Sequence, residues 1–172
     1  MHPDLHRKEA YYYDLPRELI AQYPLQGRDE SRLMHLKCAA GEIHHRSFKD
    51  LPDLLREGDL LVFNNSKVFP ARIYGVKDNG TRVEVLLLHP STKEMIWKCL
   101  VHPGKRVKQD QWLTFSDTFK GYIHGASEEG IREIELDVHG DLFSELDRIG
   151  HIPLPPYIDR DDEVDDRDRY QT

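Results

Sequence analysis

The feature that most constrains the fold is a series of short strand-like segments in the middle of the chain. Turns rich in Gly, Asn, Pro and Ser separate these segments at intervals of roughly 8–12 residues. Such spacing is typical of a small β-barrel or β-sandwich, because each short strand must turn back to pair with a neighbour. The predicted strands span residues 68–74, 82–88, 95–101, 112–115, 120–124 and 131–138.

Two local patterns support this prediction. Asp78-Asn79-Gly80 supplies the residue types that most readily form a tight hairpin turn. From Arg132 to Val138 polar and apolar residues alternate one by one, as in a strand with one face on a core and the other in water. We therefore expect an all-β barrel domain at residues 65–138.

The flanking sequence mixes segments typical of helices with segments typical of strands. Residues 59–64 contain a run of four apolar residues, which predicts a strand buried on both faces. Residues 152–157 are rich in Pro and predict an extended segment that cannot pair inside a sheet. The other predicted elements are helices at residues 14–20, 50–55 and 141–148 and strands at residues 31–37 and 42–48.

The fold class that follows is an α/β (α+β) framework with an inserted all-β barrel domain. Residues 1–64 are its first part, and residues 139–172 return to it after the barrel. The return is short, and Tyr170-Gln171-Thr172 carry no turn or cap. We therefore expect an incomplete framework in a chain that is truncated.

Composition and charge exclude several classes of protein. Asp and Glu (31) outnumber Lys and Arg (24), and the net charge of −7 argues against a surface that is basic throughout. Seven acids and three arginines between residues 159 and 169 account for −4 of that charge (3 − 7 = −4). The rest of the chain is close to neutral, so local basic patches can still meet a nucleic acid.

Signals for membranes, metals and common cofactors are missing from the sequence. No apolar run approaches the roughly 18 residues of a membrane helix, and the start of the chain lacks a signal-peptide pattern. Cys38 and Cys99 stand far apart, the ten histidines are scattered apart from the adjacent pair His44-His45, and there is no phosphate-binding Gly-rich motif. We expect a cytoplasmic protein with no membrane contact, no metal and no permanently bound cofactor.

Two stretches in the first half of the chain carry side chains suited to binding polar ligands. Arg28, Ser31 and Arg32 combine guanidinium groups with a hydroxyl, which suits a phosphate or carboxylate, although a salt-bridged loop has the same composition. A second stretch offers amide and hydroxyl groups and then an arginine, and a plain Asn-rich turn is its alternative. Its residues are Asn64, Asn65, Ser66 and Arg72.

Two further stretches lie later in the chain. Lys105, Arg106 and Lys108 follow a Pro-Gly turn and could contact phosphate groups, although a solvated turn looks the same. A rigid Pro-Pro-Tyr segment could hold an aromatic ring as a stacking wall, or could be a linker with one anchoring ring. The candidate residues of this last stretch and of the end of the chain are Pro156, Tyr157, Arg160, Tyr170 and Gln171.

Taken in order, these stretches resemble the N-terminal half of the S-adenosylmethionine:tRNA ribosyltransferase-isomerase family of queuosine biosynthesis. The resemblance spans nearly the whole chain from Tyr12. The matching motifs are Tyr-Asp-Leu-Pro at residues 13–16, Glu-Leu-Ile-Ala-Gln at 18–22, Arg28, Ser-Arg-Leu at 31–33, Gly-Asp-Leu-Leu-Val-Phe-Asn at 58–64, Pro-Ala-Arg at 70–72, Val-Glu-Val-Leu-Leu-Leu at 83–88, Pro-Gly-Lys-Arg at 103–106, Leu-Pro-Pro-Tyr-Ile at 154–158 and Tyr-Gln-Thr at 170–172.

The resemblance implies a tRNA-modifying enzyme. The family moves the ribosyl part of S-adenosylmethionine onto 7-aminomethyl-7-deazaguanine at the tRNA wobble position, giving epoxyqueuosine and releasing adenine and methionine. It implies an α/β domain with an inserted β-barrel, tRNA and S-adenosylmethionine as partners, no metal, and a monomer when the chain is complete. It leaves the catalytic base unidentified.

The family's chemistry suggests roles for the candidate residues. Tyr157 would help form a wall for adenine, Arg32 or Arg72 would bind carboxylate or phosphate, and Asn64 with Ser66 would hold ribose hydroxyls. Lys105 and Arg106 would contact tRNA. The family typically has Asn-Asp-Thr-Arg where this chain has Asn-Asn-Ser-Lys at residues 64–67, so Asn65 replaces a carboxylate by an amide that cannot ionise.

Two alternatives belong to other functional classes. The fragment could be an RNA-binding β-barrel without catalytic activity, in which case it would bind tRNA but release no adenine. A β-rich domain that binds proteins or carbohydrates would fail to bind tRNA even at low salt.

Overall fold

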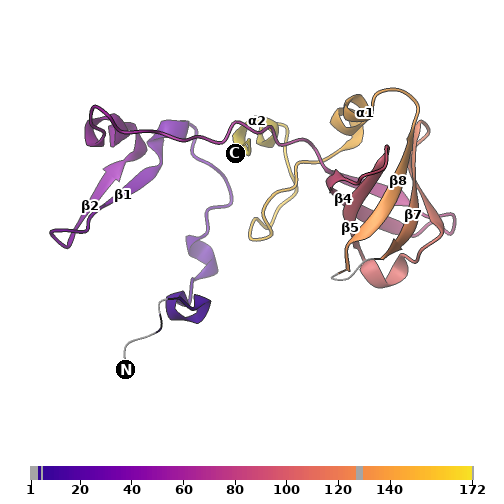
Figure 1. Cartoon of the computed structure of the whole chain (residues 1–172), viewed down its shortest axis with the longest axis horizontal. Coiled ribbons are helices and arrows are strands. Elements are labelled where there is room, and N and C mark those ends of the chain that lie inside the picture. The colour runs from indigo at the N-terminus through magenta and orange to yellow at the C-terminus, as the bar shows by residue number, and fades with distance from the viewer. Residues whose placement is uncertain (1–3, 5, 127–129, 172) are drawn as a thin grey trace. The chain divides into compact units, whose positions relative to one another are not determined.

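The computed structural model describes residues 4, 6–126 and 130–171, and its ribbon is shown in Figure 1. The chain divides into two compact units, which are described separately. The N-terminal unit contains Met1–Phe63 and Pro156–Arg160, and the barrel unit contains Asn64–Pro155 and Asp161–Thr172. Within the described residues, no helix is both long and apolar enough to span a membrane.

The barrel unit is built around a closed antiparallel barrel with the strand order β3-β4-β5-β8-β7-β6. This confirms the predicted all-β insertion. The strand predicted at residues 68–74 begins later than expected, because Pro70 has no N–H to donate to a neighbouring strand. The strands are β3 (Arg72–Val76), β4 (Arg82–Pro90), β5 (Ile96–His102), β6 (Gln111–Ser116), β7 (Phe119–Ala126) and β8 (Arg132–Val138).

Alternating side chains of these strands fill the barrel interior. Gly121 faces this interior, and a Cβ atom there would lie 2.6 Å from Cδ1 of Ile134, so the close packing requires glycine. Burial of such apolar area contributes about 25 cal/mol per Å² to folding, which makes the barrel the stable part of the molecule. The fully buried residues include Ile73, Val83, Val85, Cys99, Leu113, Phe119, Ile123 and Ile134.

Helix α1 (Leu142–Ile149) follows β8 and packs Leu146, which is fully buried, into the same core. Its N-cap is Asp141, whose carboxylate accepts hydrogen bonds from the backbone N–H of Ser144 at 2.8 Å and from its hydroxyl at 2.9 Å. The helix predicted at residues 141–148 is therefore confirmed. Gly150 follows it and approaches the backbone of Pro70 closely.

The chain after α1 runs back beside the start of β3. His151 and Arg72 exchange two backbone hydrogen bonds, with N···O distances of 2.8 and 3.2 Å. The acidic stretch ends in the short helix α2 (Asp166–Arg169), and Asp166 is buried. These contacts join the C-terminal residues to the start of the barrel.

The N-terminal unit consists of short 3-10 helices and one β-hairpin. The hairpin turns at Gly41, whose φ of 68° suits glycine, and it confirms the two predicted strands. The helices predicted at residues 14–20 and 50–55 are 3-10 turns and not α-helices, because such short segments rarely nucleate an α-helix. The elements are η1 (Lys8–Tyr11), η2 (Arg17–Leu19), η3 (Arg28–Glu30), β1 (Arg32–Lys37), β2 (Glu42–Ser47) and η4 (Phe48–Leu54).

The prediction of a buried strand at residues 59–64 is wrong for this structure. The segment has no strand assignment, and Leu60, Val62 and Phe63 are 86%, 86% and 76% exposed. The physical reason is that no described strand pairs with it, and no described sheet covers its apolar side chains. In the N-terminal unit, none of the described residues is buried.

Candidate functional site

A cleft of about 690 Å³ in the N-terminal unit brings together two segments that are far apart in the sequence. The first segment contains η2 and the residues after it. The second is the Pro-Pro-Tyr segment that the sequence marked as a rigid wall. The lining residues are Arg17, Ile20, Gln22, Pro156, Tyr157 and Asp159.

The side-chain amide of Gln22 holds these two segments together. Its Nε2 donates to the carbonyl oxygens of Tyr157 and Ile20, each at 3.2 Å. Its Oε1 accepts the backbone N–H of Asp159 at 2.6 Å. Because one amide bonds to the backbone of both Tyr157 and Asp159, it fixes the position of the backbone around Tyr157.

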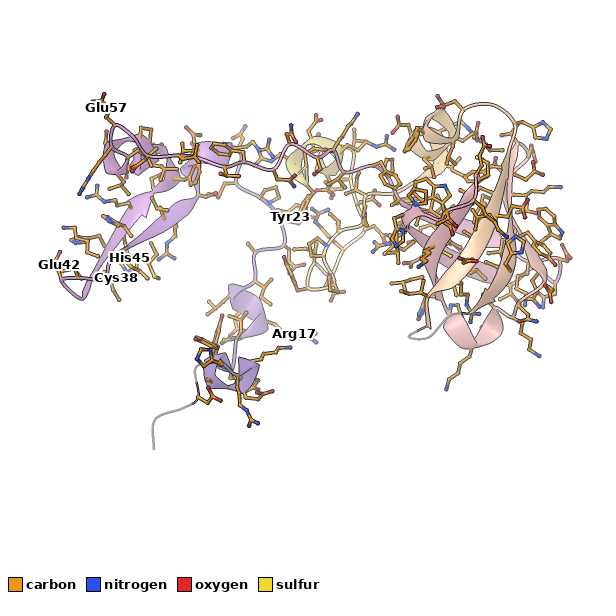
Figure 2. The ribbon with its side chains drawn as sticks, in the orientation of Figure 1. Arg17, Tyr23, Cys38, Glu42, His45 and Glu57 are labelled. Carbon is orange, nitrogen blue, oxygen red and sulfur yellow. The ribbon has the colours of Figure 1, made fainter. Side chains whose placement is uncertain are left out.

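Arg160 reinforces the same junction. Its Nε donates to the carbonyl oxygen of Gln22 at 2.9 Å, and its guanidinium carbon lies 4.3 Å from the centre of the Tyr23 ring. The side chain of Tyr23 is labelled in Figure 2, beside the loop that carries Arg160. A cation over an aromatic face is stabilising, so the predicted binding residue Arg160 supports the loop.

The cleft presents an aromatic ring and two opposite charges. Tyr157 is 59% exposed, and its backbone is held in place, so its ring can stack against a planar ligand. Arg17 and Asp159 are both exposed in the same lining. A guanidinium and a carboxylate can bind the carboxylate and the ammonium group of an amino acid, and the ring can bind a base.

The cleft residues Arg17, Gln22 and Asp159 were missed by the sequence predictions. Gln22 lies inside the motif at residues 18–22, which was the available signal. Its partners in the second segment, however, lie 135 to 138 residues further along the chain. No local pattern reports a contact at that separation.

Arg28, Ser31 and Arg32 also lie in the N-terminal unit, at η3 and the start of β1. All three are exposed, and none of these described residues lines the cleft. The backbone here is fixed by the N–H of Phe48, which donates to the carbonyl oxygen of Ser31 at 2.7 Å. Arg32 therefore presents a cation on a structured edge of the hairpin.

Asn64, Asn65 and Ser66 begin the barrel unit and are all exposed. Oδ1 of Asn64 accepts hydrogen bonds from the backbone N–H of Ser66 at 3.0 Å and from its hydroxyl at 2.5 Å. This is the Asx-type turn that the sequence left open as an alternative. The turn engages the Asn64 oxygen and the Ser66 hydroxyl with each other.

Arg72 is engaged with a neighbouring strand. Its Nε lies 3.1 Å from Oε1 of Glu84, and both side chains are partly buried. The adjacent Tyr74 has its pKa raised by burial, with a further contribution from the negative charge of Glu84. The ion pair makes Arg72 a contact between β3 and β4.

Gln171 makes a two-point contact with the start of the barrel. Its Oε1 accepts the N–H of Val68 at 3.0 Å, and its Nε2 donates to the carbonyl oxygen of Val68 at 3.1 Å and to that of Arg167 at 2.5 Å. The amide therefore acts like the backbone of a neighbouring strand. Tyr170, beside it, is partly exposed at the end of α2.

Lys105, Arg106 and Lys108 lie on the barrel, at and after the 3-10 turn η5 (Gly104–Arg106). All three side chains are exposed, whereas Val107 between them is buried. The structure thus places the predicted basic residues together on one anchored turn. Within the described ranges, no group of three or more His, Cys, Asp or Glu residues is arranged to hold a metal ion.

Comparison with known proteins supplies the family. Residues 8–172 match the model of the queuosine biosynthesis protein family. The chain is 45% identical over 166 residues to an S-adenosylmethionine:tRNA ribosyltransferase-isomerase of Halothermothrix orenii, covering 95% of this chain and 48% of the relative. It is 44% identical to a crystal structure of S-adenosylmethionine tRNA ribosyltransferase from Thermotoga maritima, with a TM-score of 0.36, covering 72% of this chain and 43% of that chain.

The match runs through both units of the molecule. It includes the cleft segments around Gln22 and Tyr157 and the basic turn at Lys105. The chain spans about half the length of the curated relative, 48% of it. The family resemblance drawn from the sequence motifs is confirmed, and the chain belongs to the queuosine biosynthesis protein family.

Proposed function

We propose that this chain serves a tRNA-modifying reaction in which S-adenosylmethionine donates its ribosyl group. The observation that carries the proposal is the 45% identity, over 95% of the chain, to a protein named S-adenosylmethionine:tRNA ribosyltransferase-isomerase. The acceptor is the amine of 7-aminomethyl-7-deazaguanine at the wobble position. The products are epoxyqueuosine in tRNA, adenine and methionine.

In this proposal the cleft beside Tyr157 binds S-adenosylmethionine. The exposed ring of Tyr157 stacks on the adenine, and the charges of Arg17 and Asp159 meet the carboxylate and ammonium groups of the methionine part. Gln22 fixes the loop before the ligand arrives, so less conformational entropy is lost on binding.

The reaction then needs a base and an unprotonated amine. The positive sulfonium acidifies the neighbouring ribose carbon, so a base can remove a proton there, and the tRNA amine attacks only when it is neutral. For binding of an anionic group, Arg32 is the better candidate than Arg72. Arg72 is already paired with Glu84, whereas Arg32 is exposed.

The experiment that tests the reaction measures adenine release. The protein is incubated in the cytoplasmic pH range with labelled S-adenosylmethionine and tRNA that carries the 7-aminomethyl-7-deazaguanine base. The proposal predicts adenine release that depends on this tRNA, in a single turnover. No release above that seen with tRNA lacking the base would contradict it, and tRNA binding without release would favour the non-catalytic RNA-binding barrel.

Asn65 offers a second test of the same reaction. The family resemblance indicates a carboxylate where this chain has the Asn65 amide, which cannot accept a proton at neutral pH. If that carboxylate takes part in proton transfer, Asn65→Asp increases the single-turnover rate of adenine release. Asn65→Gln, which keeps the amide, is the matched control and leaves the rate unchanged or lower.

A further inference from the structure

The closed antiparallel barrel separates its connections between two ends. The links after β3 and β5, at residues 77–81 and 103–110, share one end with the last described residues of β7 and the start of β8. The links after β4, β6 and β8 share the other end, where α1 begins. Figure 1 shows η5 and α1 at opposite ends of the barrel. We call the first of these the η5 end.

Basic residues gather at the η5 end. Its described acids are Asp78 and Asp110, and Asp110 accepts a hydrogen bond from the hydroxyl of Tyr122 at 3.1 Å. Glu128 and Glu129, which lie between β7 and β8 in the sequence, are outside the described residues. The cations of the η5 end are Lys77, Arg82, Lys105, Arg106, Lys108 and Arg132.

The opposite end has a different charge. Its links contain the acids Glu94, Asp117 and Asp141 and the cation Lys93, and Arg72, which is paired with Glu84, begins β3 at this end. Among the described residues, the η5 end of the barrel is therefore more positive than the opposite end, although the whole chain has a net charge of −7. The described cations of the η5 end attract a polyanion more strongly than those of the opposite end do.

The η5 turn is also held in place from both sides. Nζ of Lys77 donates to the carbonyl oxygen of Arg106 at 2.9 Å, and Nη2 of Arg132 donates to the carbonyl oxygen of Gly104 at 2.8 Å. Val107 anchors the turn in the core, with 2% of its surface exposed. The backbone is thus fixed, and the exposed side chains of Lys105 and Arg106 project from it into solvent.

We propose that the η5 end of the barrel is a docking surface for the phosphate backbone of RNA. Lys105, Arg106 and Lys108 contact phosphates, and Lys77 and Arg132 hold the turn that carries them. The inference rests on the proposed function, which names tRNA as the partner. It adds which end of the barrel the RNA meets and which residues fix that surface.

Phosphate contacts have a measurable signature, because each one releases counterions from the nucleic acid. The logarithm of the association constant falls linearly with the logarithm of the salt concentration, with a slope that grows with the number of contacts. The experiment measures tRNA binding by the full chain from about 50 to 200 mM salt. The double variant Lys105→Gln/Arg106→Gln is compared with Lys93→Gln, which removes an exposed cation at the opposite end.

The proposal predicts that the double variant binds tRNA at least about tenfold more weakly and reduces the salt slope by about one unit per lost contact. Lys93→Gln leaves both the affinity and the slope at wild-type values. Because the substituted side chains are exposed, the double variant is expected to keep the wild-type melting temperature. Lys108→Gln alone provides a second variant, which is expected to reduce the salt slope by about one unit.

The outcomes separate this inference from the proposed function. The docking surface is overturned if the double variant keeps the wild-type tRNA affinity and salt slope, or if Lys93→Gln loses as much tRNA affinity as the double variant. Either result leaves the proposed reaction standing. Weaker binding in the double variant but no adenine release by the wild type supports the docking surface and contradicts the reaction. A wild-type chain that binds no tRNA at low salt overturns both.

Discussion

At the scale of single residues, burial gives the two cysteines different chemistry. Cys99 is fully buried in the barrel, and desolvation raises the pKa of its thiol to about 12, although the nearby charge of Arg132 opposes the shift. Cys38 is exposed on the hairpin, where Figure 2 labels it. The thiolate is the reactive form, so only Cys38 is accessible in a reactive state.

A thiol titration checks this difference. We expect one thiol of the native protein to react with an aromatic disulfide reagent at pH 8, and two after unfolding. Cys38→Ser removes the fast reaction, whereas Cys99→Ala leaves it unchanged. Two thiols reacting at the same rate in the native protein would contradict the barrel packing.

The N-cap of α1 gives a prediction about pH. Hydrogen bonds from the backbone N–H and the hydroxyl of Ser144 lower the pKa of Asp141. A lowered carboxyl pKa stabilises the fold above the unfolded value of about 3.9, and this contribution is lost as the pH falls through the folded value. Asn is an equally good N-cap but does not titrate.

We therefore expect the wild type to lose more stability than Asp141→Asn when the pH is lowered from 5 to 3. Between pH 5 and 7 the difference in melting temperature between the two proteins stays constant. Circular dichroism melts at each pH provide the measurement. Parallel loss of stability in both proteins would show that the cap does not carry the effect.

Sequence reasoning found part of the candidate site at this scale. Pro156, Tyr157 and Arg160 were predicted because a Pro-Pro-aromatic segment is locally rigid. Arg17 and Gln22 were not, because the cleft forms only when the segment around Gln22 bonds to residues more than 130 positions away.

At the scale of elements, the barrel and the N-terminal hairpin were predictable, and the failure of residues 59–64 to form a strand was not. Strand periodicity and turn residues are local, and a closed barrel satisfies every strand from within the insertion. The segment 59–64 has the apolar run of a buried strand, but a strand also needs partners on both sides. Without a described partner it stays exposed, and the local pattern cannot reveal this.

The close contact between the end of α1 and Pro70, which precedes β3, gives a prediction at this scale. A Cβ atom on Gly150 would lie 2.2 Å from the carbonyl oxygen of Pro70 and 2.5 Å from that of Leu146. Gly150→Ala therefore forces a backbone shift and lowers the free energy of unfolding by about 1–3 kcal/mol. Gly104→Ala is the control, since a Cβ there meets nothing within 4 Å.

Urea unfolding of both glycine variants measures the effect. We expect Gly104→Ala to stay within about 0.5 kcal/mol of the wild type, as an unhindered substitution does. Equal stability of Gly150→Ala and the wild type would mean that the α1 junction is looser than the structure indicates.

At the scale of the whole molecule, stability is unevenly distributed. The hydrophobic core lies entirely in the barrel unit, and none of the described residues of the N-terminal unit is buried. Segments with few buried contacts open more readily and are cut first by proteases. The candidate cleft thus belongs to the less stable part of the chain.

Limited proteolysis tests this distribution. Brief trypsin treatment is expected to cut first after basic residues in the N-terminal unit, such as Lys49 and Arg56, and to leave Lys98 and Lys120 in the barrel uncut. Mass spectrometry of the early fragments identifies the sites. First cuts inside the barrel strands would contradict the assignment of the core.

The central claim is that the cleft beside Tyr157 binds S-adenosylmethionine, and calorimetric titration of this ligand into the protein tests it most directly. The account predicts saturable binding that Tyr157→Ala weakens by about tenfold, because stacking of one base on an aromatic ring is worth about 1–3 kcal/mol. Tyr12→Ala, which removes an exposed tyrosine outside the cleft lining, leaves the affinity unchanged. No binding to the wild type, or equal affinity in all three proteins, would contradict the claim.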